Sequence, residues 1–167
     1  MAAWREIILK RKPVGILLSR QNLPVLDRTK FASPSLVSRG AYALTSIPNP
    51  DVILIATGSE VALALAAATE LNAKGERVQV VSAPCLEWFN KQPDEYREKV
   101  WPKEVKARVS VEAGISQGWN SFVGDLGECV SIEHFGASAS HTKLFEEFGF
   151  TVSQVVKAAE KSLAKAR

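Results

Sequence analysis

Arg20 is the residue of this sequence best suited to binding an anion. It directly follows the short apolar run Val14–Ser19 and precedes Gln21 and Asn22. A guanidinium held at the end of a strand can bind a phosphate or a carboxylate through two parallel hydrogen bonds. The alternative interpretation is a structural ion pair with a carboxylate of the protein. Residue types alone leave both interpretations of Arg20 open.

Three side chains near the ends of expected strands could transfer protons. These are Glu112, Glu133 and His134, and a Glu–His pair in a pocket can act as a general acid and base. No nucleophile accompanies them, so we expect them to orient loops through hydrogen bonds. His141 follows His134 within a Gly/Ala/Ser loop. Zinc needs three or four ligands, and no third ligand is evident, so we expect no metal site.

The two cysteines indicate structural roles in a reducing compartment. Cys85 and Cys129 lie far apart and outside any CxxC motif, which is typical of a reduced, cytoplasmic protein. Cys85 begins a short helical pattern, where a helix N-terminus can lower the pKa of a thiol. We favour a small apolar packing residue. We also expect Trp88, Phe89, Tyr96 and Trp101 to pack in a core or a subunit interface.

Glycine-bearing polar loops at 57–59, 113–118 and 134–138 each follow an expected strand. Ligands of open α/β sheets bind outside the carboxyl ends of the strands, so these loops could face one crevice. The first of them matches neither a P-loop nor GxGxxG, and we expect a tight turn between strand and helix. A crevice shared by all three would indicate an independent ligand-binding module.

Apolar runs and amphipathic segments alternate along the chain. Val52–Ala56 is continuously apolar, which is typical of a central parallel strand covered on both faces. Capping boxes are expected at 57–60 and 151–154. The pattern predicts strands at 14–19, 39–47, 77–82, 107–112 and 128–133, and helices at 1–12, 61–74, 86–89, from Pro93, at 143–148 and from 151 to the end.

Strands separated by helices imply βαβ crossovers. We therefore predict an α/β fold in three layers, with a mostly parallel sheet of about five strands and one antiparallel edge strand. The 167 residues are 46% hydrophobic and 23% charged, with a net charge of +3. This balance indicates a soluble globular protein and argues against nucleic acid as a partner. The apolar runs are too short for a membrane span or a secretory signal.

Several motifs resemble the C-terminal region of transketolases. The run LLSRQNLP from Leu17 to Pro24 resembles the segment that closes the central, pyrimidine-binding domain, and VILIATGSEV from Val52 to Val61 resembles the first strand–turn–helix of the C-terminal domain. The resemblance implies that residues 1–35 are the tail end of the central domain and a linker, and that 36–167 are the C-terminal domain. Further matching segments lie at 80–85, 87–89, 94–97, 111–114, 134–138 and 144–151.

The resemblance implies a cytoplasmic, homodimeric parent enzyme of the pentose phosphate pathway. That enzyme transfers a two-carbon ketol unit from ketose phosphates to aldose phosphates, using thiamine diphosphate and Mg²⁺ or Ca²⁺. The family's arginine that matches Arg20 binds the substrate phosphate. The groups that bind the cofactor and the metal lie in other segments of the family. The chain itself is therefore expected to contribute no catalytic, cofactor-binding or metal-binding residue.

By itself the chain is expected to be inactive and to have a structural role, supporting the remaining domains and the dimer. Two alternatives stay open. One is an independent regulatory module that binds a ligand, and the other is a part of a relative similar to dihydroxyacetone synthase.

Overall fold

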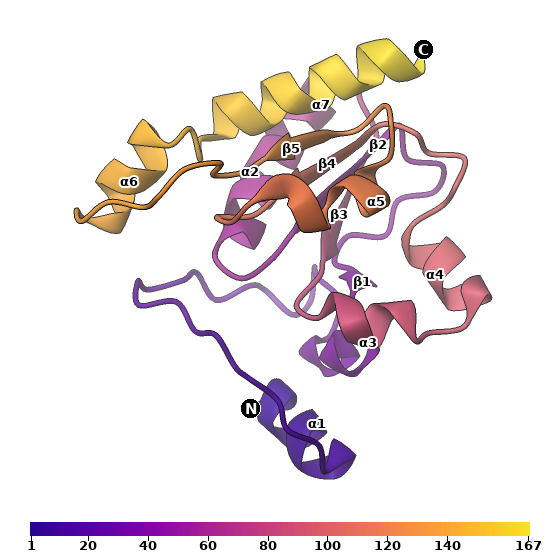
Figure 1. Ribbon diagram of the computed structural model, residues 1–167. Coiled ribbons are helices and arrows are strands. Elements are labelled where there is room, and N and C mark those ends of the chain that lie inside the picture. Colours follow the sequence, from indigo (N-terminus) through magenta and orange to yellow (C-terminus); the bar gives the residue numbers. More distant parts are fainter.

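The structure, a computed structural model, describes residues 1–167 and contains a five-stranded sheet with helices on both faces (Figure 1). The strand order is β1-β3-β2-β4-β5. β1 is antiparallel to β3, and all other neighbours are parallel. This confirms the predicted fold class. The strands are β1 (Tyr42–Ala43), β2 (Val52–Ala56), β3 (Val78–Ser82), β4 (Arg108–Val111) and β5 (Glu128–Val130).

Seven α-helices and two short 3₁₀ segments connect and cover the strands. No helix combines the length and the apolar surface that crossing a bilayer requires. The helices are α1 (Ala2–Lys10), α2 (Glu60–Ala73), α3 (Leu86–Asn90), α4 (Asp94–Val100), α5 (Asn120–Val123), α6 (His141–Glu147) and α7 (Val152–Ala166), and the 3₁₀ segments are η1 (Pro34–Arg39) and η2 (Ser116–Gly118).

β2 is the central strand, as its apolar sequence predicts. All five of its residues are buried. Because successive side chains of a strand point to opposite faces, Leu54 packs in a core with α2 and α7, whereas Ile53 and Ile55 pack in a second core with α3, α4 and α5. The second core contains Phe89 and Trp101. Burial on both faces explains why β2 shows no alternation of apolar and polar residues.

One of the two expected capping boxes is wrong. The Thr57 hydroxyl donates to the Glu112 carboxylate instead of capping α2, and α2 begins after Ser59 without a side-chain cap. The Thr151 hydroxyl does cap α7, because it accepts a hydrogen bond from the backbone N–H of Gln154 at 3.3 Å. The sequence pattern cannot show that a strand neighbouring β2 offers Thr57 a competing carboxylate.

The expected strand at 14–19 is also wrong. This segment forms no ladder, and the side chains of Leu17 and Leu18 are 95% and 80% exposed. A strand needs a neighbour for its backbone N–H and C=O groups, and no strand of this chain lies beside it. Figure 1 shows α1 and the extended stretch that follows it set apart from the sheet. Two other strands, expected at 39–47 and 128–133, are observed only as the shorter strands β1 and β5.

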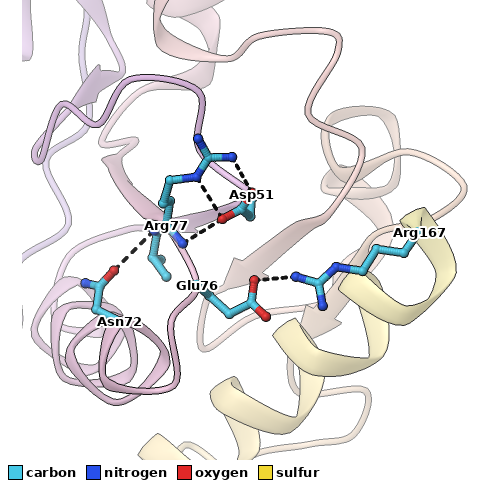
Figure 2. A network of polar contacts seen from close by, with 6 residues as sticks. Asp51, Asn72, Glu76, Arg77 and Arg167 are labelled. Carbon is cyan, nitrogen blue, oxygen red and sulfur yellow. Dashed lines mark hydrogen bonds and ion pairs between the residues drawn. The ribbon is translucent and has the colours of Figure 1, made fainter.

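The amino edge of the sheet is held by charged side chains (Figure 2). Asp51 accepts hydrogen bonds from the backbone N–H of Arg77 at 2.8 Å and from its guanidinium at 2.6 and 3.0 Å. Glu76 pairs with Arg167 at 2.5 Å, which ties the end of α7 to the start of β3. These contacts join segments that are far apart in the sequence. They lie at the amino ends of the strands, whereas ligands of open α/β sheets bind at the carboxyl ends.

Candidate functional site

The carboxyl ends of β2 and β4 lie side by side in the middle of the sheet, where Ala56 pairs with Val111. β2 continues into α2 on one face of the sheet, while β4 continues into η2 and α5, which pack on the other. Ligands of open α/β sheets bind in the crevice that such a reversal creates. The side chains that follow the two strands, Thr57 and Glu112, therefore occupy the candidate site.

Glu112 fills this crevice with interactions of the chain itself. Its Oε1 accepts a hydrogen bond from the Thr57 hydroxyl at 3.3 Å, and its Oε2 accepts one from the indole Nε1 of Trp119. Trp119 is buried. Both carboxylate oxygens are thus engaged, and Glu112 fastens the segment after β4 to the end of β2. This confirms the expectation that Glu112 orients a loop.

Glu60 is a buried carboxyl group beside the same crevice, and its burial was not expected. Only 4% of the residue is exposed, and its Oε1 accepts a hydrogen bond from the Ser59 hydroxyl at 2.7 Å. Burial raises the pKa of Glu60, and the nearby charge of Glu112 adds to this effect. A usable signal lay in the sequence, since Glu60 directly follows a continuously apolar strand and its turn, and precedes an apolar helix.

Glu133 joins two of the loops. Its Oε1 accepts hydrogen bonds from the backbone N–H of Ser116 at 2.9 Å and from the Ser131 hydroxyl at 2.8 Å. The Ser131 hydrogen bond, followed by that of Ser116, lowers the pKa of Glu133. The carboxylate forms no hydrogen bond with His134, whose Nδ1 lies beside a backbone carbonyl instead, so the expected loop-orienting role is confirmed and the alternative Glu–His pair is not formed.

Both histidines are exposed. The ring of His134 packs edge-on against Phe148, with 4.8 Å between ring centres, and its Nδ1 lies 2.8 Å from the carbonyl oxygen of Phe135. His141 is the first residue of α6. The structure brings no three His, Cys, Asp or Glu side chains together in a way that could hold a metal ion.

The 57–59 loop lines a cavity without the other two polar loops. A cavity of about 500 Å³ beside the β2–α2 turn is lined by Gly58 and Ser59 and by apolar residues that include Tyr42 and Leu44. Neither the 113–118 loop nor the 134–138 loop contributes to it. This cavity therefore does not join the three loops into one ligand-binding crevice.

Arg20 lies in the extended segment between α1 and the sheet, and its side chain is exposed. None of the ion pairs in the chain involves it. Arg20 thus has no ion-pair partner within this chain. The structure leaves the guanidinium of Arg20 available to a group from outside the chain.

The other candidate residues serve packing. Burial raises the pKa of the Cys85 thiol, which argues against a reactive thiolate. Phe89 and Trp101 are buried and stack with 5.1 Å between ring centres, and Tyr96 contacts Phe89 edge-on. Trp88 is half-buried, and the Nζ of Lys10 from α1 lies 4.4 Å from its ring centre. The expected core role is confirmed for Phe89 and Trp101.

Comparison with known proteins gives consistent matches. A family model described as a transketolase-like C-terminal domain matches residues 40–151. A transketolase of Mycobacterium tuberculosis is 53% identical over 96% of this chain and 24% of its own length. One of Aquifex aeolicus is 48% identical over 92% of this chain and 22% of its own length. The chain thus spans about a quarter of the length of these curated relatives.

Solved structures agree with this fold. Transketolase from Leishmania mexicana superposes with a TM-score of 0.75 at 40% identity, over 80% of this chain and 19% of that one. A Pichia stipitis transketolase in complex with sedoheptulose-7-phosphate gives 0.78 at 36% identity, over 87% and 20%. A split-gene transketolase described as an inactive β4 tetramer gives 0.65 at 22% identity, over 89% and 49%, which shows the fold alone.

Proposed function

The chain belongs to the transketolase family, and from this we propose that it works as the C-terminal part of an enzyme that transfers a two-carbon ketol unit between sugar phosphates. The observation that carries the proposal is the 53% identity over 96% of the chain to a curated transketolase. The similarity covers the exposed segment that contains Arg20 as well as the sheet. The pentose phosphate pathway is the metabolic setting of the proposal.

Residues 1–35 form the end of a preceding domain in this proposal, and the rest of the chain forms the C-terminal domain. Two observations support this boundary. The family model begins at residue 40, and no residue before Gly40 is buried within the chain. The exposed apolar side chains of Leu17, Leu18 and Val25 would then pack against the remaining domains of the enzyme.

Arg20 binds the phosphate of the sugar in this proposal. Its guanidinium is exposed, free of ion pairs and placed in the segment that resembles the family's phosphate-binding motif. A permanently charged planar group suits a phosphate because two of its N–H groups can donate to two oxygens at once. The role of Arg20 is to bind and orient the substrate, and it moves no proton.

Thiamine diphosphate and Mg²⁺ or Ca²⁺, which the family implies, do not fit the residues of this chain. No three side chains capable of holding a metal gather anywhere in it, and the carboxylates nearest the crevice are engaged within the chain. We therefore assign these groups to other parts of the enzyme and derive no catalytic step through them. The proposed role of the chain is to support the other domains and a homodimer. Two free cysteines suit a reducing, cytoplasmic location.

The proposal is tested by measuring ketol transfer with the purified chain and with the complete enzyme. We expect no transfer by the chain alone. In the complete enzyme, Arg20→Gln should raise KM for a phosphorylated aldose about tenfold or more, because it removes a charged hydrogen-bonding group, and should leave KM for unphosphorylated glycolaldehyde unchanged. Arg28→Gln, another exposed arginine of the same segment, is the matched control.

Ketol transfer by the chain alone would overturn the proposed division of labour. Equal effects of Arg20→Gln on phosphorylated and unphosphorylated substrates would overturn the phosphate-binding role of Arg20. Light scattering of the complete enzyme tests the dimer independently of both.

A further inference from the structure

The cavity of about 500 Å³ beside the β2–α2 turn lies at the carboxyl ends of two strands. Ser82, the last residue of β3, pairs with Ala56 at the end of β2 and with Tyr42 of β1. Ser82 and Tyr42 both line the cavity, and Tyr42 packs in the core that contains α2. The cavity therefore lies on the α2 face of the sheet, at the edge where ligands of open α/β sheets bind.

Two backbone N–H groups at the start of α2 are free on the wall of this cavity. The helix has 14 residues and receives no side-chain cap from Ser59. Val61 and Ala62 line the cavity, and their N–H groups donate to no backbone carbonyl. The positive end of the helix dipole adds to these donors, so the start of α2 attracts an anion. Water satisfies many such helix ends, and by itself this end indicates no ligand.

Tyr42 adds an independent sign of a ligand, because its hydroxyl is nearly buried and has no partner. Only 8% of the residue is exposed. Its hydroxyl takes part in none of the hydrogen bonds of the chain, whereas the hydroxyl of Tyr96 donates to the Ala41 carbonyl oxygen at 3.0 Å. The side-chain atoms sealed from solvent without a partner are those of Arg97 and Trp101, so the Tyr42 hydroxyl keeps accessible surface. Since Tyr42 lines the cavity, we take this surface to face it. Buried tyrosine hydroxyls usually find a partner.

The charge on the lining is positive. Arg28 is the one charged side chain that lines the cavity, and it forms no ion pair in the chain. Glu60, the first residue of α2, does not line it, and its Oε1 accepts the Ser59 hydroxyl. An anion in the cavity would thus meet a guanidinium, two backbone N–H groups and a phenolic hydroxyl, with no carboxylate on the lining.

The rest of the lining is mostly apolar, and its size suits a small molecule. Ligand pockets have volumes of roughly 300–1,000 Å³ and combine apolar walls with a few polar groups. The apolar wall is formed from both sides of the chain's boundary near residue 40, by Leu23, Val25, Leu26, Val37, Leu44 and Pro84. An inorganic anion would leave this wall unused, so the lining favours an anion that carries an apolar body.

We propose that this cavity binds a phosphomonoester with an aromatic or aliphatic body. The phosphate oxygens accept the N–H groups of Val61 and Ala62 and the hydroxyl of Tyr42, and Arg28 compensates the charge. The three terminal oxygens of the phosphate match this number of donors better than the two of a carboxylate do. The body of the ester lies against the apolar wall. This site is independent of the proposed enzymatic function, because it uses neither Arg20 nor the crevice at Glu112.

The test uses phenyl phosphate as the probe, with the purified 167-residue chain, and is followed by isothermal titration and by thermal unfolding. We expect saturable binding and a rise in Tm, neither of which occurs with sodium chloride at equal ionic strength. Tyr42→Phe keeps the aromatic ring and removes only the hydroxyl. It should weaken phenyl phosphate binding about tenfold or more, the effect expected for a hydrogen bond to a charged acceptor.

Tyr96→Phe is the matched control, since it also removes one phenolic hydroxyl but Tyr96 does not line the cavity. It should leave the affinity for phenyl phosphate unchanged. If Tyr42→Phe does not fold, Arg28→Gln replaces it, because Arg28 is exposed and its substitution removes the positive charge of the lining without disturbing the core.

Three results would overturn the proposal. They are the absence of saturable phenyl phosphate binding up to its solubility limit, equal affinity in the wild-type chain and the cavity variant, and binding of inorganic phosphate or benzoate as tight as that of phenyl phosphate. A purely structural role of Tyr42 makes a different forecast. Tyr42→Phe would then change the Tm of the free chain and leave the affinity for phenyl phosphate as it is.

Discussion

Val14–Ser19 and Val52–Ala56 are both short apolar runs, yet they lie in opposite environments. The second is the fully buried centre of the sheet, whereas the first is exposed and forms no ladder. The same contrast holds for the two regions around them, because every buried residue belongs to residues 40–167 and none to 1–39. An apolar run becomes a strand only where neighbouring strands satisfy its backbone, and its own residues do not reveal whether such neighbours exist.

Gly40, where the buried part of the chain begins, is the position at which we expect a substitution to destabilise the folded region most. Its φ is +86°, and a Cβ there would overlap the backbone nitrogen of Phe89 and the carbonyl oxygen of Cys85. Gly40→Ala should therefore lower the free energy of unfolding by about 4 kcal/mol, through combined backbone strain and overlap. Urea unfolding followed by circular dichroism measures this loss.

Gly75 provides the control for this substitution. Its φ is +93°, but a Cβ there would meet nothing within 4 Å. Gly75→Ala should cost only the conformational part, about 1 kcal/mol. If Gly40→Ala and Gly75→Ala lower the free energy of unfolding equally, Gly40 does not pack against the backbone at the start of α3 as it does in the structure.

A pair of leucines tests the contrast directly. Leu54 is fully buried between β2 and the helices α2 and α7, so Leu54→Ala should destabilise the chain by about 3 kcal/mol through lost burial and a residual cavity. Leu17 is 95% exposed, and Leu17→Ala should leave the free energy of unfolding of this chain unchanged. A loss above about 1 kcal/mol for Leu17→Ala would mean that the side chain of Leu17 packs on the folded region.

The central strands of the sheet could be predicted from the sequence, whereas the structure of the segment before the sheet could not. β2, β3 and β4 follow from runs of apolar residues bounded by turns, and the helix α2 follows from its periodicity and from Gly75. These signals are local. The pairing of Val14–Ser19 depends on residues distant in sequence or outside the chain, and no local pattern reports on it.

At the candidate site, too, contacts between residues distant in sequence could not be predicted. Glu112 and Glu133 were identified correctly because they follow strands, and side chains at strand ends gather at one edge of a parallel sheet. Their partners were missed. Thr57 was expected to cap a helix, and Trp119 was not considered as a donor, because both contacts arise only when β2 and β4 lie side by side.

Substituting Glu60 tests how the burial of a carboxyl group in the folded region affects the free energy of unfolding. Its pKa is raised, mainly because burial penalises the charged form. The folded state therefore holds the proton more tightly than the unfolded state, and stability falls as pH rises from the unfolded pKa of about 4.3 through the raised folded value. Glu60→Gln should remove this fall and raise the free energy of unfolding at pH 7 by about 1 kcal/mol.

Glu70 lies exposed on the same helix, and Glu70→Gln should change neither quantity. The measurement is urea unfolding of the three chains between pH 4 and pH 8. A lower stability of Glu60→Gln at pH 7 would show that the ionised carboxylate is favourable where it lies, and the assigned cost of its burial would be wrong.

Two aspartates provide the finest comparison between the regions. Both have lowered pKa values, but Asp51 receives its hydrogen bonds from Arg77, across the amino edge of the sheet, whereas Asp27 receives its bonds from Thr29 two residues away. The pKa of Asp51 is lowered to about 2. A lowered folded pKa means stability that is present above the unfolded pKa of about 3.9 and is lost as pH falls through about 2.

Asp51→Asn should therefore lower the free energy of unfolding at pH 7 by less than about 1 kcal/mol, since the pair is largely exposed and screened by solvent. The difference from the wild-type chain should shrink as pH falls from 4 to 2. Asp27→Asn should change nothing in the same titration, because the hydrogen bonds that the Asp27 carboxylate accepts from Thr29 hold only a local, exposed turn. A pH-dependent loss for Asp27→Asn would show that the Asp27–Thr29 turn contributes to the stability of the folded region, and would thereby remove the distinction between the two aspartates.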